Sequence, residues 1–225
     1  MSIKAVFFDI DGTLVDSNGF HVLAWEQAFR EAGFLIPVEA IRKQIGKGAD
    51  TLIPSLFPDS DDPTRQAIAD RHGQIFQSQY LPQVKPFPGA KQLIERLHRE
   101  GRKILLASSA KAPEVQHYSQ LLGVQPLLHA TISADDVKHS KPAGDIFAGA
   151  LAKVPPLPAS ETVAIGDTPY DIVAADKCGI KTIGLLSGGF SKKELEEAGA
   201  IAICASVQEL LANLEASPLA SPAGS

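Results

Sequence analysis

Two carboxylates near the start of the chain, Asp9 and Asp11, have a spacing that could support chemistry. Residues 3–9 are largely apolar and predict a strand buried on both faces, and the alternation of strand side chains lets both carboxylates aim at one side where the strand ends. Such a pair stays ionised only beside a positive charge, most simply a divalent metal ion. Gly12 permits a sharp turn that presents backbone N–H groups to an anion, so the segment indicates phosphoryl chemistry.

Polar side chains also follow later strand-like segments. Ser108 and Ser109 come after one apolar run, Lys141 stands between a strand and a helix, and Asp167 follows another run, with Asp171 four residues beyond it. These residues also have ordinary explanations. The serines and Asp171 could be helix caps, and Lys141 could be a solvated surface charge. Ligands of doubly wound sheets bind at the carboxyl ends of strands, so these groups are candidates for one common site.

The order of these segments resembles that of the haloacid dehalogenase superfamily, and in particular its phosphoglycolate phosphatase and β-phosphoglucomutase-like subgroup, which has a helical cap after the first motif. That motif reads DxDGT in the family. The matching residues, in chain order, are Asp9-Ile10-Asp11-Gly12-Thr13, then Ser108, then Lys141, and finally Gly166-Asp167 with Asp171 in the form GDxxxD. The resemblance covers the chain up to about residue 216.

The resemblance implies a different role for each of these carboxylates. Asp9 would be the nucleophile that forms an aspartyl-phosphate, and Asp11 would protonate the leaving oxygen and then activate water. Mg²⁺ would be held by Asp9, by the backbone carbonyl of Asp11 and by Asp167. Asp171 and Thr13 would support these ligands from behind.

The same resemblance implies which groups bind the phosphoryl oxygens. Ser108 and Lys141 would hold them, with Ser109 and the backbone amides near Gly12 as further candidates.

The elements that must position these groups divide the chain in two. Residues 18–80 show amphipathic helices and no convincing strand, whereas helices and strands alternate after Gly89. We therefore predict an α/β fold, a Rossmann-like doubly wound parallel sheet core with an inserted small α-helical cap. The core would comprise 1–15 and 88–216, and the cap 16–87. Residues 217–225 are rich in Pro, Ser, Ala and Gly, which predicts a disordered tail.

Two cap residues are candidates for substrate contact. His21 lies just past the first crossing into the cap, and it could face the site or be an ordinary first-turn surface histidine. Lys47 lies between two glycines, and it could reach the substrate or remain in solvent. The cap as a whole would close over the site, exclude water and select the leaving group.

Composition narrows the classes of protein. The net charge is −5 and basic residues form no block, so nucleic-acid or anionic-membrane binding is not favoured. No apolar run approaches the ~20 residues of a membrane span, and the N-terminus does not have a secretory pattern. The two cysteines form no disulfide framework or metal spacing. We expect a cytoplasmic protein, a monomer or weak dimer, that acts on a small phosphorylated substrate.

Among the family's activities, the residues favour an Mg²⁺-dependent phosphatase. Dehalogenases lack an acid at the position of Asp11, and phosphonatases use a cap lysine, for which Lys47 is a candidate. β-Phosphoglucomutases usually carry Glu-Asp where this chain has Gly166-Asp167, and Ser-Lys-Asn where it has residues 110–112, Ala-Lys-Ala. A signalling or binding module that holds a phospho-aspartate without turnover is the alternative from another class. The substrate stays open among phosphoglycolate, sugar phosphates and nucleotides.

Overall fold

A six-stranded parallel sheet forms the centre of the computed structural model, which describes residues 2–220. The strands, in their spatial order, are β5 (Leu128–Ile132), β4 (Lys103–Ala107), β1 (Ala5–Phe8), β6 (Thr162–Gly166), β7 (Lys181–Leu185) and β8 (Ala202–Cys204). Phe8 of β1 is level with Leu106 of β4 and with Ile165 of β6. The strands that precede Asp9, Ser108 and Asp167 are therefore neighbours, and their carboxyl ends meet at one edge.

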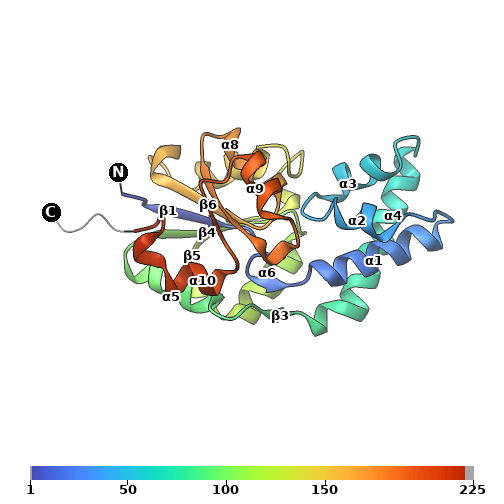
Figure 1. The fold of residues 1–225 in the computed structure, drawn as a ribbon. Coiled ribbons are helices and arrows are strands. Elements are labelled where there is room, and N and C mark those ends of the chain that lie inside the picture. Colours follow the sequence, from blue (N-terminus) through green and yellow to red (C-terminus); the bar gives the residue numbers. More distant parts are fainter. Residues whose placement is uncertain (1, 221–225) are drawn as a thin grey trace.

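Helices cover both faces of the sheet (Figure 1). They are α5 (Ala90–Arg99), α6 (Ala112–Leu122), α7 (Asp145–Ala152), α8 (Pro169–Asp176), α9 (Lys192–Ala198) and α10 (Val207–Ala212). Strand β1 is buried on both sides: Phe7 packs in one apolar cluster with Phe147 of α7, and Phe8 packs in another with Leu93 of α5. A strand covered on both faces accounts for the unbroken apolar run before Asp9.

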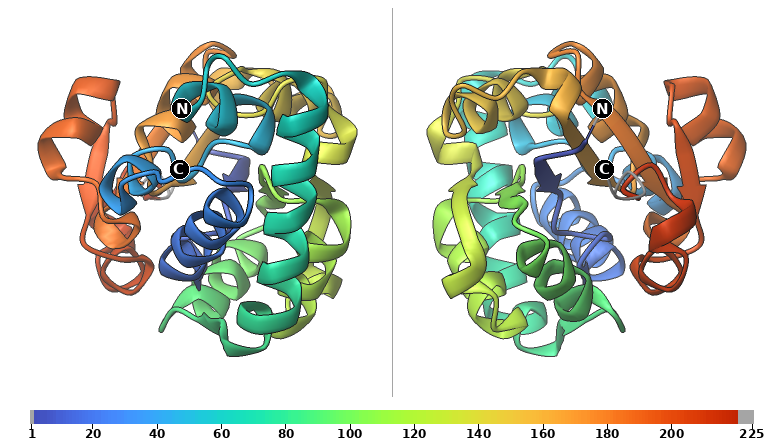
Figure 2. Two further views of the ribbon diagram at one scale, coloured as in Figure 1. Left: turned by 90° about the vertical axis from the view of Figure 1, so that its right-hand side faces the viewer. Right: turned by 90° about the vertical axis from the view of Figure 1, so that its left-hand side faces the viewer.

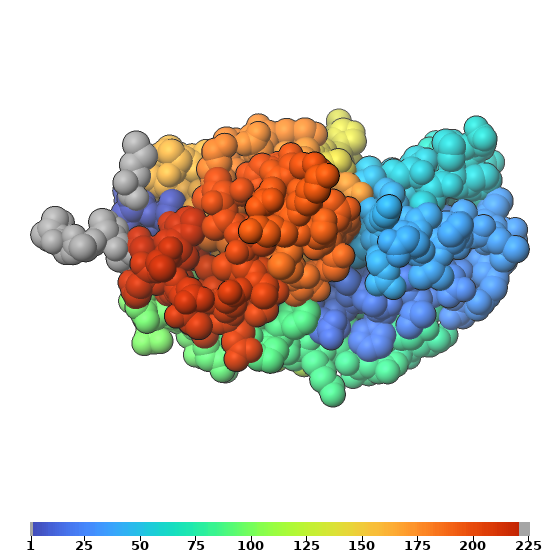
Figure 3. Space-filling view, viewed as in Figure 1, coloured from blue at the N-terminus to red at the C-terminus, as the bar shows by residue number. Residues whose placement is uncertain are grey.

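Residues 18–80 form a separate group of helices beyond the carboxyl edge of the sheet, which we call the helical layer (Figures 1 and 3). Its elements are α1 (Asn18–Glu31), α2 (Val38–Arg42), α3 (Ala49–Leu56), α4 (Asp62–Ile75) and a π-helical turn at Phe76–Tyr80. Helices α1 and α4 pack side by side (Figure 2). The chain enters and leaves the layer through a short antiparallel pair, β2 (Val15–Asp16) with β3 (Lys85–Pro86).

The predicted doubly wound parallel sheet is confirmed, and the division at residues 15/16 and 87/88 stays a prediction. The predicted disorder from Ser217 is wrong for 217–220, and 221–225 lie outside the described residues. Leu219 is fully buried in the apolar cluster, and its carbonyl accepts a hydrogen bond from Arg102 at 2.5 Å. Burial of this apolar side chain and the hydrogen bond from Arg102 hold the polar segment against the core. Within residues 2–220, no helix has the length and apolar character to cross a membrane.

Candidate active site

Three buried carboxylates meet at the carboxyl edge of the sheet. Asp9 follows β1, Asp167 follows β6, and Asp171 lies in the first turn of α8. One oxygen from each lies within 4.8 Å of the others. Burial raises the pKa of Asp9 to about 7 against the lowering effect of Lys141, and the charges of Asp171 and Asp11 add to the rise. Burial and the charges of Asp9 and Asp171 also raise the pKa of Asp167. The cluster therefore requires positive charge.

Lys141 supplies part of that charge from a fully buried position. Its Nζ lies 2.5 Å from Asp9 Oδ1 and 2.7 Å from Asp171 Oδ1, and it donates to the carbonyl of Ala107 at 2.7 Å. Burial alone would lower the pKa of Lys141, but the charges of Asp171 and Asp9 raise it overall. The ammonium therefore stays charged and links the first, third and fourth motifs.

Asp171 acts both as a helix cap and as a member of the buried cluster, with one carboxylate oxygen for each role. Its Oδ2 accepts hydrogen bonds from the backbone N–H of Thr168 at 3.1 Å and from the Thr168 hydroxyl at 2.7 Å, which caps α8. Its Oδ1 pairs with Lys141. The helix cap thus holds the carboxylate in the orientation in which it meets the buried cation.

Asp167 is held by two donors from the segment after β1. Thr13 Oγ1 donates to Oδ1 at 2.7 Å, as expected for a supporting residue, and Asn18 Nδ2 donates to Oδ2 at 2.9 Å. A Cβ added at Gly12 or Gly188 would lie about 2 Å from Asp167 Oδ2, so only glycine leaves room for this carboxylate. No sequence signal points to Asn18, because an asparagine at a helix start looks like an ordinary cap.

The turn at Gly12 has the expected left-handed conformation, with φ of +75°. Its own N–H is already used, since it donates to the carbonyl of Val15 at 2.9 Å. Among the described residues, the N–H groups of Ile10 and Asp11 donate no hydrogen bond. The amides free to meet an anion are therefore those just before Gly12 and not that of Gly12 itself.

Asp11 points into a different cluster from Asp9. Its Oδ1 accepts from the hydroxyl of Ser17 at 2.5 Å and lies 3.2 Å from His21 Nε2, which is itself 3.7 Å from Glu114 Oε1. Burial opposes ionisation, but the charge and hydrogen bond of His21 lower the pKa of Asp11. His21, whose ring stacks on Phe76 at 3.8 Å between centroids, is thus placed at the site.

Glu114 was missed by sequence reasoning. It lies in the first turn of α6, where an acid is common, so its type and position carried no functional signal. Burial raises its pKa to about 7, with the charge of His21 acting in the opposite direction. Its Oε1 is buried and has no hydrogen-bond partner among residues 2–220, although it faces the same space as Asp11.

The remaining predicted residues lie around the same space but differ in contacts. Ser108 is buried, and its Oγ accepts from the N–H of Ala110 at 3.0 Å. Ser109 donates to the carbonyl of Gly46 at 3.3 Å, which ties it to the helical layer. Lys47 Nζ donates to Gln44 at 2.5 Å and to Ser55 at 3.1 Å, and it touches none of the carboxylates of the cluster.

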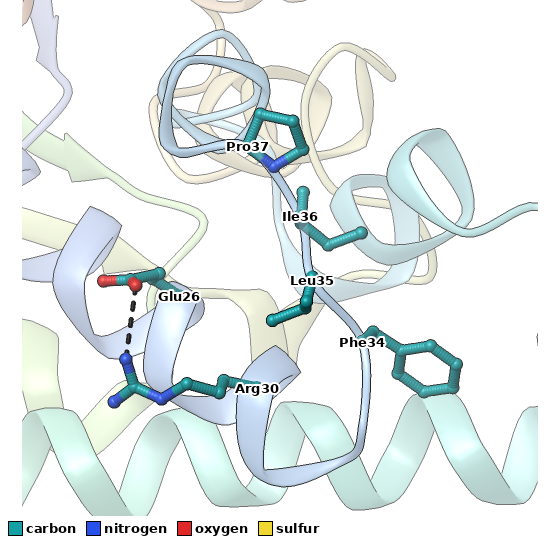
Figure 4. A pocket seen from close by; sticks show the side chains of 6 residues that line it. All are labelled: Glu26, Arg30, Phe34, Leu35, Ile36 and Pro37. Atoms are coloured by element: carbon teal, nitrogen blue, oxygen red, sulfur yellow. Dashed lines mark hydrogen bonds and ion pairs between the residues drawn. The ribbon is translucent and has the colours of Figure 1, made fainter.

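A cavity of about 370 Å³ opens between the sheet edge and the helical layer. We call the sheet side of this cavity the floor: it comprises the lining residues Asp9, Asp11 and Ser108 and the buried groups next to Asp9, which are Lys141, Asp167 and Asp171. The roof of the cavity is the part formed by the helical layer, with Trp25, Lys47, Asp70, His72, Gln74 and Gln77. A second cavity of about 270 Å³, within the helical layer, shares no residue with the first and contains the Glu26–Arg30 ion pair, 3.3 Å long (Figure 4). Of these two cavities, the first reaches the buried cluster of carboxylates, through Asp9.

The buried carboxylates fit a hard divalent cation. Magnesium prefers oxygen ligands, and Asp9, Asp167 and Asp171 bring three carboxylates together, with no side chain at Gly12 or Gly188 to displace Asp167. The carboxylate of Asp11 instead groups with His21 and Glu114. Asp11 would therefore contact the ion held by Asp9 and Asp167 through its backbone carbonyl and not through its carboxylate.

The chain is similar to known proteins over most of its length. The family model of haloacid dehalogenase-like hydrolases matches residues 6–185. A phosphoglycolate phosphatase from Vibrio vulnificus is 27% identical over 83% of this chain and 85% of its own length. Pyrophosphatase PpaX from Oceanobacillus iheyensis is also 27% identical, over 81% of this chain and 83% of its own length. A hydrolase structure from Pseudomonas syringae is 30% identical, covers 95% of this chain and 98% of its own, and superposes with a TM-score of 0.89. The chain belongs to the haloacid dehalogenase-like hydrolase family.

Proposed function

We propose that this hydrolase is an Mg²⁺-dependent phosphatase that acts on a small phosphorylated metabolite through an aspartyl-phosphate on Asp9. The observation that carries the proposal is the placement of Lys141 between Asp9 and Asp171, 2.5 Å and 2.7 Å away, at the floor of a cavity that also exposes Asp11. A nucleophile, a fixed cation and a second acid at one cavity are what phosphomonoester cleavage requires.

In the first step, an oxygen of Asp9 attacks phosphorus as the bond from phosphorus to the leaving oxygen breaks. His21, whose pKa burial would lower but the charge of Asp11 raises, carries a proton 3.2 Å from the Asp11 carboxylate, and Asp11 passes this proton on to the leaving oxygen. In the second step Asp11 takes a proton from water, and the water oxygen attacks phosphorus. Inorganic phosphate leaves and Asp9 is restored as a carboxylate.

We assign Asp9, Asp167 and the backbone carbonyl of Asp11 as the groups that would hold Mg²⁺. When bound, the ion supplies positive charge beside the phosphoryl oxygens. The protein's own contribution is to fix these oxygens in advance, since Thr13 and Asn18 each donate a hydrogen bond to one carboxylate oxygen of Asp167.

The phosphoryl oxygens would be held by Ser108, by Lys141 and by the free N–H groups of Ile10 and Asp11. Lys141 also offsets the repulsion between Asp9 and an anionic substrate. We do not assign Ser109 to this group, because its hydroxyl is used by the carbonyl of Gly46. His21 acts through Asp11, and Lys47 belongs to the part of the cavity that selects the leaving group.

The packing around Gly166 supports a phosphatase over a phosphoglucomutase. The mutase-like glutamate would stand at this position. A Cβ there would lie 2.5 Å from Cβ and Cγ of Asp171, so any side chain would displace the carboxylate that pairs with Lys141. The names of the relatives, phosphoglycolate phosphatase and pyrophosphatase, support phosphate release as the reaction class.

The test is turnover of an aryl phosphate by the purified protein with Mg²⁺ and with a chelator. We expect many turnovers with Mg²⁺ and almost none without it. Phosphate release that stops after one equivalent would instead indicate a phospho-aspartate signalling module, and no metal-dependent turnover would overturn the proposal. A panel of phosphorylated metabolites, assayed in the same way, then identifies the substrate class.

A further inference from the structure

A carboxylate of the helical layer reaches across to the residue that precedes Lys141. Asp50, in the first turn of α3, accepts a hydrogen bond from the backbone N–H of Ser140 at 3.0 Å and another from the Ser140 hydroxyl. The N–H of Gly48 also donates to that hydroxyl, at 2.9 Å. The chemistry proposed above makes no use of these contacts.

The segment around Gly48 in the helical layer and the segment around Ser140 approach more closely than an ordinary surface contact allows. Ser140 is only 4% exposed, and Gly48 is buried against it. A Cβ added at Gly48 would lie 2.5 Å from the Cβ of Ser140, so the contact depends on the absence of a side chain there. The close approach makes Ser140 part of the junction between the helical layer and the sheet.

Ser140 and Lys141 are held from opposite sides. The ammonium of Lys141 has its partners on the sheet side, namely Asp9, Asp171 and the carbonyl of Ala107. The backbone N–H of Ser140 has its partner in the helical layer, in Asp50. The position of the segment that carries the buried cation therefore depends on both parts of the molecule.

We propose that Asp50 is a positioning residue that couples closure of the helical layer to the placement of Lys141. When the layer moves away, the N–H and hydroxyl of Ser140 lose their partners and the segment is released on that side. Because linkage is reciprocal, a phosphoryl group that holds Lys141 in place also favours the closed layer. The inference deepens the proposed function and rests on it only where turnover is measured.

Asp50 could also act as a favourable charge at the start of α3, and suitable variants separate the two roles. Asp50→Asn keeps an oxygen acceptor for Ser140 but loses the charge, whereas Asp50→Ala loses both. Asp62→Ala is the matched control, because Asp62 lies in the first turn of α4 in the same layer and its side chain is 96% exposed. If the role is positioning, Asp50→Asn should resemble the wild type; if it is charge, it should resemble Asp50→Ala.

The first measurements require no turnover. Amide hydrogen exchange would be followed across residues 138–141, together with chemical acylation of Lys141 detected by peptide mass spectrometry. For Asp50→Ala we expect about tenfold faster exchange at Ser140 and a similar gain in labelling of Lys141, since a local opening exposes both groups. Asp50→Asn should stay within about threefold of the wild type, and Asp62→Ala should not differ from it.

The second measurement is kcat/KM for an aryl phosphate with Mg²⁺. We expect a loss of about tenfold for Asp50→Ala, equivalent to about 1.4 kcal/mol, and largely preserved activity for Asp50→Asn. Should Asp50→Ala fail to fold, Ser140→Ala removes the hydroxyl contacts and keeps the backbone N–H, with an expected loss of about threefold.

Wild-type exchange and labelling in Asp50→Ala would overturn the inference, as would faster exchange with unchanged kcat/KM. A wild-type protein with no Mg²⁺-dependent turnover would refute the proposed function instead. In that case exchange and labelling would still decide whether Asp50 positions the Lys141 segment.

Discussion

The floor and the roof of the cavity are built differently. Floor side chains are buried and bond to one another: Asp9 and Asp171 share Lys141, and Asp167 is held from the turn after β1. Roof side chains bond mostly within the helical layer, where His72 stacks on Trp25 at 3.8 Å and Lys47 bonds to its own neighbours. Apart from contacts such as that of Asp50 with Ser140, roof side chains such as Lys47 can therefore change without disturbing the floor. This difference supports the proposal that the floor performs the reaction and the roof selects the substrate.

Replacement of the nucleophile tests the floor most severely. Asp9→Asn should lower kcat for an aryl phosphate by about 10⁴-fold or more, because an amide cannot form the aspartyl-phosphate. Steady-state assays with Mg²⁺ would measure the loss. Asp16→Asn is the control, since Asp16 is an exposed carboxylate close by in the chain, and it should retain wild-type activity. Substantial turnover by Asp9→Asn would remove Asp9 from the proposed mechanism.

Replacement of the floor cation should affect stability as well as activity. Lys141→Met leaves Asp9 and Asp171 without their shared partner in the interior, so the free energy of unfolding should fall by about 3 kcal/mol. The value of kcat/KM should fall by about 10²- to 10³-fold. Urea unfolding in chelator measures the first effect. Lys181→Met, which removes an exposed lysine paired with Asp176, should change stability by less than about 0.5 kcal/mol.

Metal binding should stabilise the floor more at high pH than at low pH. The pKa of Asp9 is raised from 3.8 to about 7, so the folded state retains a proton that the unfolded state loses near pH 3.8. Without metal, the resulting stability is present at low pH and is lost as pH rises through about 7. Added Mg²⁺ competes with that proton, so it should raise Tm more at about pH 8 than at about pH 5.

Thermal melts with Mg²⁺ and with chelator at both pH values measure this difference. An equal shift of Tm at the two pH values would show that the ion does not bind at the carboxylates of the floor. The same melts on Asp9→Asn should show a smaller dependence on pH, because that variant lacks the carboxylate that exchanges a proton for the ion.

A roof variant should have the smallest effect on the reaction itself and should alter selectivity. Lys47→Met should leave aryl phosphate turnover within about threefold, while the ratio of kcat/KM between two phosphorylated metabolites changes by up to about tenfold. A substrate panel measures these ratios. Lys43→Met, an exposed lysine of the same layer that does not line the cavity, is the control. An equal loss for every substrate would place Lys47 with the floor.

Much of the floor could be predicted from the chain alone. Asp9, Ser108 and Asp167 each follow a buried strand, and parallel strands bring their carboxyl ends to one edge whatever the details of packing. The spacing of Asp171 from Asp167 fixed it near the same edge, and the resemblance to a known family added Lys141. Among the backbone N–H groups near Gly12 that were expected to meet an anion, the structure leaves those of Ile10 and Asp11 free, because the N–H of Gly12 closes the turn onto Val15.

The sequence by itself therefore determined the sheet, the insertion of a helical segment and the acidic and basic groups at the strand ends. Only the tertiary structure decided which helical-layer residues face them. Asn18 on Asp167, Glu114 beside His21 and Asp50 on Ser140 are contacts between segments far apart in the chain. The apolar stripe of a helix predicts that the helix packs against the rest of the protein. It does not predict which loop the polar side chains of that helix will contact, because this depends on how the helical layer packs against the sheet.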